Sequence, residues 1–265
     1  MRQLELSEIM KIETEILQHF DQLCQKYHLR YSIAYGTMIG CIRHKGFIPW
    51  DDDIDVIMPR KDYEKLLKLQ YKSGNYEIRS YRYTKGYYYP FAKMIDASTL
   101  IHEPNRCETD MGLFIDIFPL DYVPENVDFA KLEKDTEAHN RNLLLLGVSK
   151  ENAIQKSALS RFKRKEFYYL VKPFRKFLLE KGESKYFNLR PSESGLIMNQ
   201  FFVVRRGKCY RMTDFDSLLR LPFENIEVSV LKNYDEMLRG IYGDYMQLPP
   251  VEQRVNPHQL KAWKK

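Results

Sequence analysis

An acidic run that continues directly into an apolar segment most constrains the fold of this chain. The run contains Asp51, Asp52, Asp53 and Asp55 and leads into Val56-Ile57-Met58. Carboxylates beside a buried strand are costly unless a counter-charge neutralises them. Residues two apart in a strand point to the same face, so Asp53 and Asp55 are spaced to bind one cation. Because hard oxygen ligands suit Mg²⁺, we interpret the pair as ligands of Mg²⁺ (or Mn²⁺); an ordinary salt bridge or cap is the alternative.

A third carboxylate, Asp116, lies inside the apolar segment Leu113–Phe118. Phe114 and Phe118 share its strand parity, which argues against an exposed position. We interpret Asp116 as the third carboxylate of the metal site and as an acceptor for the proton of an attacking hydroxyl group. The alternative is a buried aspartate whose oxygens accept hydrogen bonds from backbone donors.

Residues suited to phosphate binding surround the acidic run. Gly36-Thr37 is expected at a strand-to-helix turn, where free backbone N–H groups attract phosphate, although an ordinary turn would look the same. The basic candidates are Arg43, His44, Lys45 and Lys93. Each is suited to hold a phosphate oxygen, with a salt bridge to the acidic run as the alternative. Asp51 and Asp52 are expected in the preceding turn, Asp52 as a substrate contact or a turn former.

Size and charge set the broad class. The 265 residues, 44% of them hydrophobic, are enough for one large domain or two small ones. The net charge of +6 fits an anionic substrate or a membrane surface better than a nucleic-acid coat, and a solvated surface explains it equally well. The four cysteines form no CxxC pair, which favours reduced thiols and the cytoplasm. Without a run of about 20 apolar residues, any membrane contact is expected to be peripheral.

Periodicity predicts an α/β (α+β) protein in three parts. Residues 1–125 are expected to form the catalytic core, residues 126–200 a helical region and residues 201–265 a C-terminal segment that packs back on the core. Helices are predicted at 7–27, with Ser7 as N-cap, and at 37–43, 61–69, 129–147, 153–181 and 234–242, with a kink at Pro173. Strands are predicted at 31–35, 54–58, 76–81, 89–96, 99–102, 113–118, 201–205 and 226–229. Pro119 and Pro124 are read as turns that end the core, and the tail as irregular.

Three blocks of sequence resemble the LicD family of phosphocholine transferases. They are GTMIGCIRHKGFIPWDDDIDVIMPRKDYEKL, LFIDIFPLDYVP and YGDYMQLPPVEQR, in the order that the family shows. More broadly, Gly36-Thr37, Asp53-Ile54-Asp55 and a later strand with Asp116 are similar to the nucleotidyltransferase superfold. The resemblance implies a mixed sheet with flanking helices and a helical insertion. Residues 129–200 match no block.

The resemblance also implies a reaction. Family members transfer a phosphorylated alcohol, typically phosphocholine from CDP-choline, to a glycan hydroxyl, and CMP leaves. Asp53, Asp55 and Asp116 match the family's acidic positions, and Arg254 matches a basic one. The family usually has a histidine pair near the C-terminus, where this chain has His258 alone. We expect a teichoic-acid-type acceptor; transfer of another phosphorylated group or nucleotide, or a non-catalytic glycan- or nucleotide-binding module, are the alternatives.

Aromatic residues suggest where choline would bind, because aromatic faces attract quaternary ammonium groups. Trp50 adjoins the acidic run, and a second group consists of Tyr87, Tyr88, Tyr89 and Phe91. We hypothesise a choline cage among them, with core packing as the alternative for each residue.

A basic and aromatic segment at 161–176 suggests contact with an anionic membrane. It contains Arg161, Phe162, Lys163, Arg164, Lys165, Phe167, Tyr168, Tyr169, Lys172, Arg175 and Lys176. Because the acceptors of the family are often lipid-linked glycans, the protein is expected to work in the cytoplasm at the inner face of the membrane. A solvated helix face is the alternative.

Overall fold

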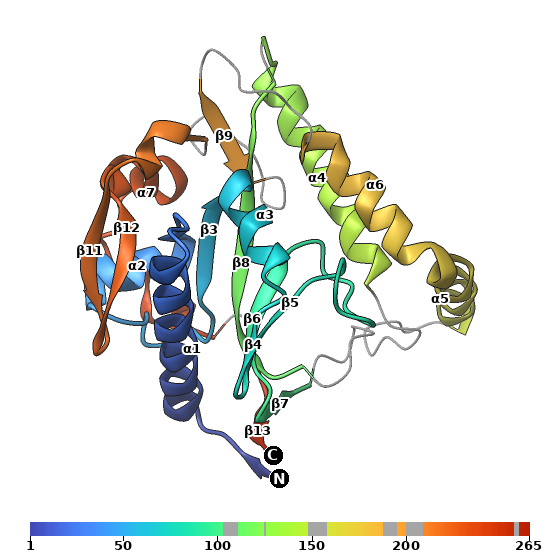
Figure 1. The fold of residues 1–265 in the computed structure, drawn as a ribbon, viewed down its shortest axis with the longest axis horizontal. Coiled ribbons are helices and arrows are strands. Elements are labelled where there is room, and N and C mark those ends of the chain that lie inside the picture. The colour runs from blue at the N-terminus through green and yellow to red at the C-terminus, as the bar shows by residue number, and fades with distance from the viewer. Residues whose placement is uncertain (103–110, 125, 148–157, 188–194, 200–208, 257–259) are drawn as a thin grey trace.

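The computed structural model describes residues 1–102, 111–124, 126–147, 158–187, 195–199, 209–256 and 260–265 (Figure 1). The predicted strand at 201–205 and His258 lie outside these residues. Within them the architecture is a mixed sheet with helices on its sides, which confirms the predicted fold class.

The central sheet is organised around its longest strand. Its members are β2 (Ser32–Ile33), β3 (Asp55–Pro59), β4 (Lys72–Ser73), β5 (Tyr76–Arg79), β6 (Ala92–Asp96), β8 (Leu113–Tyr122), β9 (Leu196–Asn199) and β10 (Tyr210–Arg211). Strand β8 pairs with β3 in parallel and with β6 and β9 antiparallel. Pro119 does not end this strand as predicted, because β8 runs on to Tyr122 and its last residues pair with β9.

Helices α1 (Leu6–Lys26) and α3 (Arg60–Lys68) pack on the sheet. Helix α1 contacts β6, β8 and β12 (Ile226–Leu231), and buries an apolar face that includes Ile16, Leu17 and Phe20. It begins at a capping box between Glu5 and Glu8 rather than at the predicted Ser7, because a reciprocal pair of side-chain-to-backbone bonds satisfies its first free N–H groups. Helix α2 (Tyr35–His44) follows β2 directly and returns the chain toward β3.

The helical segment packs beside the sheet. It consists of α4 (Phe129–Leu146), α5 (Ala158–Val171), the short 3₁₀ turn η1 (Lys172–Phe174) and α6 (Arg175–Phe187). Helices α4 and α6 lie side by side, and α6 also contacts β8 (Figure 1). The predicted break at Pro173 is confirmed, since η1 contains this proline. A buried ion-pair network joins α6 to the core through Arg60, Asp121 and Glu183.

The C-terminal part returns to the core. Strands β11 (Leu218–Phe223) and β12 form a hairpin, followed by α7 (Tyr234–Tyr242) and the 3₁₀ turn η4 (Val251–Gln253). The tail was predicted to be irregular, but β13 (Ala262–Lys264) lies between β1 (Arg2–Gln3) and β7 (Thr99–Ile101) in a small sheet. The two ends of the chain are therefore neighbours (Figure 1).

Candidate active site

A row of charged side chains crosses three neighbouring strands. Lys93 on β6 is the register partner of Asp116 on β8, and Asp116 is the register partner of Asp55 on β3. Side chains of register partners point to the same face of a sheet, so the three groups lie in line. The Lys93 ammonium group donates a hydrogen bond to Oδ1 of Asp116. The fold thus brings together two of the predicted carboxylates, and Lys93 with them.

The backbone around Asp55 is fixed by the two elements before it. The Asp55 N–H group donates to the hydroxyl group of Thr37 at 2.9 Å, and the Asp55 carbonyl accepts from the Ala34 N–H group at 2.9 Å. Thr37 lies in the first turn of α2, so the predicted strand-to-helix turn positions the acidic strand directly. Asp55 is buried; burial, followed by the charges of Asp53 and Asp116, raises the pKa of its carboxyl group well above the ordinary value.

The rest of the acidic run is arranged around Gly36 and the C-terminal tail. A Cβ atom on Gly36 would lie 2.9 Å from Oδ2 of Asp51, so this glycine allows the carboxylate to approach the first turn of α2. Asp52 is buried, and its Oδ2 accepts a hydrogen bond from the Leu260 N–H group at 2.9 Å. Asp53 is partly exposed. Asp52 therefore fastens the tail to the site, while Asp53 is accessible from solvent.

The aromatic run before β6 surrounds Lys93. The Lys93 ammonium nitrogen lies 4.5 Å from the ring centre of Tyr89, 5.5 Å from that of Phe91 and 3.3 Å from that of Phe114. Tyr87 continues this aromatic group, with its ring centre 5.6 Å from that of Tyr89. These rings are buried. They enclose the protein's own Lys93, apart from Trp50, and the choline cage stays a hypothesis.

A second cluster lies near the C-terminal end of α2 and comprises Arg43, His44, Trp50 and Arg254. The Arg254 guanidinium group lies 5.7 Å from the centre of the Trp50 ring, and the His44 ring lies 6.5 Å from it. Arg43 Nη1 donates to the Tyr245 carbonyl at 2.6 Å. Burial, followed by the charge of Arg254, lowers the pKa of Arg43, and burial followed by Arg43 lowers the pKa of His44. The C-terminal tail thus contributes Arg254 to this cationic cluster. The sequence alone does not show that Arg254 lies beside Trp50.

Lys45 lies outside this cluster. It ends α2 in a left-handed conformation with φ of 63°, and its ammonium group donates to the Ile42 carbonyl at 3.2 Å. The left-handed backbone of Lys45 ends α2 and begins the turn that leads into the acidic run. The structure therefore places Lys45 beside its own helix end, apart from the row of Lys93, Asp116 and Asp55.

Polar groups that the sequence did not single out also lie near the carboxylates. Tyr35 accepts a hydrogen bond from Asn199 at 2.9 Å, and burial raises the pKa of its hydroxyl group well above the ordinary value, with Asp55 among the further causes. Glu13 is fully buried on α1. The sequence carries a signal for Glu13, since it occupies the apolar face defined by Ile9 and Ile16. Asn199 carries none, because it reaches the site only through the pairing of β9 with β8.

The donor set fits a hard divalent cation. All the candidate ligands are carboxylates, and Asp55 and Asp116 meet on paired strands with Asp53 just before them. Burial, followed by the charges of Asp53 and Asp116, raises the pKa of Asp55, and a bound cation would act in the opposite direction. In the part of the chain that the structure describes, no group of three or more His, Cys, Asp and Glu side chains stands ready to hold a metal ion. Asp116 instead holds the Lys93 ammonium group.

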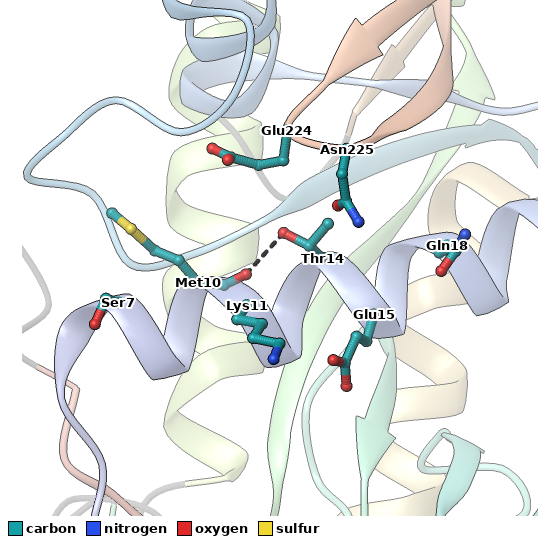
Figure 2. A pocket seen from close by; sticks show the side chains of 8 residues that line it. All are labelled: Ser7, Met10, Lys11, Thr14, Glu15, Gln18, Glu224 and Asn225. Carbon is teal, nitrogen blue, oxygen red and sulfur yellow. Dashed lines mark hydrogen bonds between the residues drawn. The ribbon is translucent and has the colours of Figure 1, made fainter.

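A separate hollow of about 520 Å³ lies between α1 and the turn of the β11–β12 hairpin (Figure 2). It is lined by Ser7, Met10, Lys11, Thr14, Glu15, Gln18, Glu224 and Asn225. None of the predicted site residues is among them, so this hollow is distinct from the charged row.

A parallel pair of acidic strands beside a strand-to-helix turn defines a nucleotidyltransferase-type site, and comparison with known proteins specifies the family. Residues 28–144 match the family described as LicD/FKTN/FKRP, nucleotidyltransferase domain. The chain is 31% identical to the lipopolysaccharide cholinephosphotransferase LicD of Haemophilus influenzae over 98% of both chains. An uncharacterized protein of Rickettsia typhi is 28% identical over 42% of this chain and 35% of its own length.

The chain therefore belongs to the LicD family, and the identification of the chain as a LicD-type enzyme is confirmed. None of the helices that the structure describes is long and apolar enough to cross a membrane.

Proposed function

We propose that this protein transfers phosphocholine from CDP-choline to a hydroxyl group of a cell-surface glycan precursor and releases CMP. The observation that carries the proposal is the alignment of Lys93, Asp116 and Asp55 on adjacent strands of a LicD-family fold. The similarity to a lipopolysaccharide cholinephosphotransferase along the whole chain supports the choice of transferred group.

In the proposed reaction the acceptor hydroxyl oxygen attacks the phosphorus atom of phosphocholine. A new P–O bond forms, the P–O bond to CMP breaks, and CMP leaves with the bonding electrons. The hydroxyl proton passes to a carboxylate, for which Asp116 is our candidate because it lies at the centre of the charged row. Lys93 holds this carboxylate in place from the neighbouring strand.

Asp53, Asp55 and Asp116 would hold Mg²⁺ or Mn²⁺. When bound, such an ion stabilises the negative charge that develops on the phosphate oxygens and on the leaving group. The cluster of Arg43, His44, Trp50 and Arg254 offers charge and an aromatic ring to the donor, with arginine suited to bidentate phosphate contacts. The free N–H groups at the first turn of α2, around Gly36 and Thr37, suit a further phosphate oxygen.

We further propose that the acceptor is lipid-linked and that the protein works at the cytoplasmic face of the membrane. The supporting surface lies on α5, η1 and α6, which Figure 1 shows at the edge of the molecule. Its exposed apolar residues are Phe162, Phe167, Tyr169, Leu170, Phe174 and Phe177. Exposed lysines accompany them at positions 163, 165, 172 and 176. Apolar rings among lysines suit the interface of an anionic bilayer.

Arg175 does not belong to this membrane surface, although the sequence placed it there. It is 1% exposed, and its guanidinium group lies 4.4 Å from the ring centre of Tyr168 and 5.1 Å from that of Tyr88. Arg175 therefore helps to join the helical segment to the loop before β6. The side chains of Arg161 and Arg164 lie outside the described part of the structure.

Co-sedimentation with liposomes tests the membrane contact. The protein is expected to bind vesicles with anionic lipid and to remain in the supernatant with neutral vesicles. Replacing both Phe174 and Phe177 with Ser should abolish binding, whereas Val251→Ser, at an equally exposed apolar position on η4, should not. Equal binding of the double variant and the wild type would contradict the proposal.

Release of CMP from CDP-choline tests the transfer itself. The assay combines the donor, Mg²⁺ and either a lipopolysaccharide-type or a teichoic-acid-type acceptor, and CMP is measured by chromatography. We expect release that requires both acceptor and metal and that Asp55→Asn abolishes while the protein stays folded. Turnover of another cytidine diphosphate alcohol in place of CDP-choline would reassign the transferred group, and binding of the donor without turnover would indicate a binding module.

A further inference from the structure

Among the described residues, Glu13 is a buried acid without a hydrogen-bond partner. It lies in the middle of α1 and is 0% exposed, and both of its carboxyl oxygens lack a partner among the described residues. Buried polar groups in folded proteins almost always have such a partner. The neighbouring positions on the same face of α1 are apolar, including Ile9, Ile16 and Leu17. An apolar side chain at position 13 would fit these surroundings better, so the carboxyl group calls for another explanation.

The surroundings of Glu13 connect it to the acidic run. Helix α1 packs against β8, the strand that carries Asp116. Burial raises the pKa of Glu13 well above the ordinary value, and the charges of Asp53, Asp52, Asp116 and Asp51 raise it further. All four of these aspartates belong to the candidate site. Glu13 adds a sixth carboxyl group to the five aspartates of the candidate site, from an element that none of the three sequence blocks includes.

We propose that Glu13 is a positioning residue of the cation site, which supports the acidic run from helix α1 and supplies negative potential that a divalent cation compensates. The inference rests on the cation dependence in the proposed function. Without a cation, burial and the charges of the aspartates favour the protonated, neutral form of this carboxyl group. With a cation bound, the ionised form becomes favourable, and its negative charge attracts the cation. Glu13 thus favours the loaded site over the empty one.

Helix α1 offers a matched control at Glu15. Two residues along a helix turn the side chain by about 200°, so Glu15 lies on a different face of α1 from Glu13. It is exposed and lines the separate hollow beside the β11–β12 hairpin (Figure 2). Glu15→Gln removes a carboxylate from the same helix without changing the surroundings of the acidic run.

The test measures Mn²⁺ binding to the whole protein by electron paramagnetic resonance, without substrates, together with the melting temperature in EDTA and in Mn²⁺. Glu13→Gln keeps the size of the side chain and removes its charge. We expect its dissociation constant for Mn²⁺ to rise about tenfold, and Glu15→Gln to match the wild type. In EDTA, Glu13→Gln should melt at or above the wild-type temperature, whereas its stabilisation by Mn²⁺ should be smaller.

Three results would decide against the proposal. Unchanged Mn²⁺ affinity in Glu13→Gln would show that the carboxyl group does not act on the cation. A lower melting temperature in EDTA with unchanged affinity would assign Glu13 a structural role. If Glu13→Gln fails to fold, Glu13→Met takes its place, and failure of both overturns the proposal because the empty protein would then need the acid. Absence of Mn²⁺ binding in the wild type would instead refute the cation dependence itself.

Discussion

Lys93 and Asp116 form an ion pair across β6 and β8, and only 2% of the lysine side chain is exposed. The pair fixes the central carboxylate of the site from one side, while Asp55 faces it from the strand on the other side. Asp116 therefore lies between a positive charge and a negative one. The pairing of β8 with β3 and β6 fixes the positions of Lys93 and Asp55 relative to Asp116. These two neighbours therefore set the orientation of the Asp116 side chain.

Replacing Lys93 with Met should lower both stability and activity. The substitution leaves Asp116 and Asp55 side by side without the ammonium group, and loss of one partner of a buried ion pair typically costs about 3–5 kcal/mol. We expect a loss of about 3 kcal/mol in the free energy of unfolding and a fall of at least about 100-fold in kcat/KM for CMP release. Urea unfolding and the transfer assay measure the two effects.

Lys65→Met is the matched control for Lys93→Met. Lys65 is 54% exposed and lies 3.8 Å from the carboxylate of the buried Asp62, which keeps a closer partner in Arg30 at 2.9 Å, so the loss of Lys65 should cost only about 0–1 kcal/mol. The control should keep nearly the wild-type stability and activity. Wild-type activity in Lys93→Met would show that Asp116 does not need the lysine.

Two glycines of the first sequence block should differ in their response to alanine. A Cβ atom on Gly40 would lie 2.4 Å from the Gly46 carbonyl oxygen, whereas one on Gly36 would meet Oδ2 of Asp51, the mobile end of a side chain. Gly40→Ala must therefore displace the backbone that leads into the acidic run, at a cost of about 1–3 kcal/mol. Gly36→Ala should lose less stability and weaken Mn²⁺ binding. Urea unfolding of both variants tests the order, and equal losses would contradict it.

Strand parity predicted from the sequence that Asp55 and Asp116 lie in buried strands, and their role as metal ligands stays a prediction. The spacing of Asp53 and Asp55, and the parity of Asp116 with Phe114 and Phe118, are local properties of the chain. The structure shows that Asp55 and Asp116 lie on neighbouring strands. Neither segment alone predicts that the two strands pair in parallel, because this pairing depends on the order of strands in the sheet.

Contacts between distant segments explain what the sequence did not show. The partners of Arg43 include the carbonyl of Tyr245, and those of Asp52 include the Leu260 N–H group. Glu13 was not predicted as a site residue for a different reason. The apolar spacing around it predicts a helix and gives no role to a single acid on the apolar face. The predicted end of β8 at Phe118 was too early, because a proline such as Pro119 normally ends a central strand, whereas β8 runs on to Tyr122.

The link between α6 and the core should depend on acid pH through Glu183. Burial would raise the pKa of Glu183, but the charges of Arg60 and Arg82 outweigh it, so the pKa lies below the ordinary value of 4.5. Because the folded carboxyl group binds its proton less readily than the unfolded one, its contribution to stability is present above about pH 4.5 and is lost as the pH falls through the folded pKa. Stability in urea should therefore fall more steeply below pH 4.5 in the wild type than in Glu183→Gln.

At neutral pH the same substitution should destabilise the protein by about 3 kcal/mol, since it breaks two buried ion pairs. Glu180→Gln provides the control on α6. Glu180 is 48% exposed and lies 3.9 Å from Lys176, so its removal should change the free energy of unfolding by less than about 1 kcal/mol at any pH. Parallel pH profiles for the wild type and Glu183→Gln would refute the assignment.

Trp50 should report binding of the donor. The chain has two tryptophans, Trp50 in the basic cluster and Trp263 on β13, where it pairs with Gln3 and Leu100 in the small sheet. In a Trp263→Phe variant the fluorescence comes from Trp50 alone, and CDP-choline should change it in a saturable way. Trp50→Ala should weaken donor binding about tenfold in calorimetry, because the donor loses an aromatic face for its cationic head group. Trp263→Phe should bind like the wild type, and unchanged affinity in Trp50→Ala would remove this ring from the donor site.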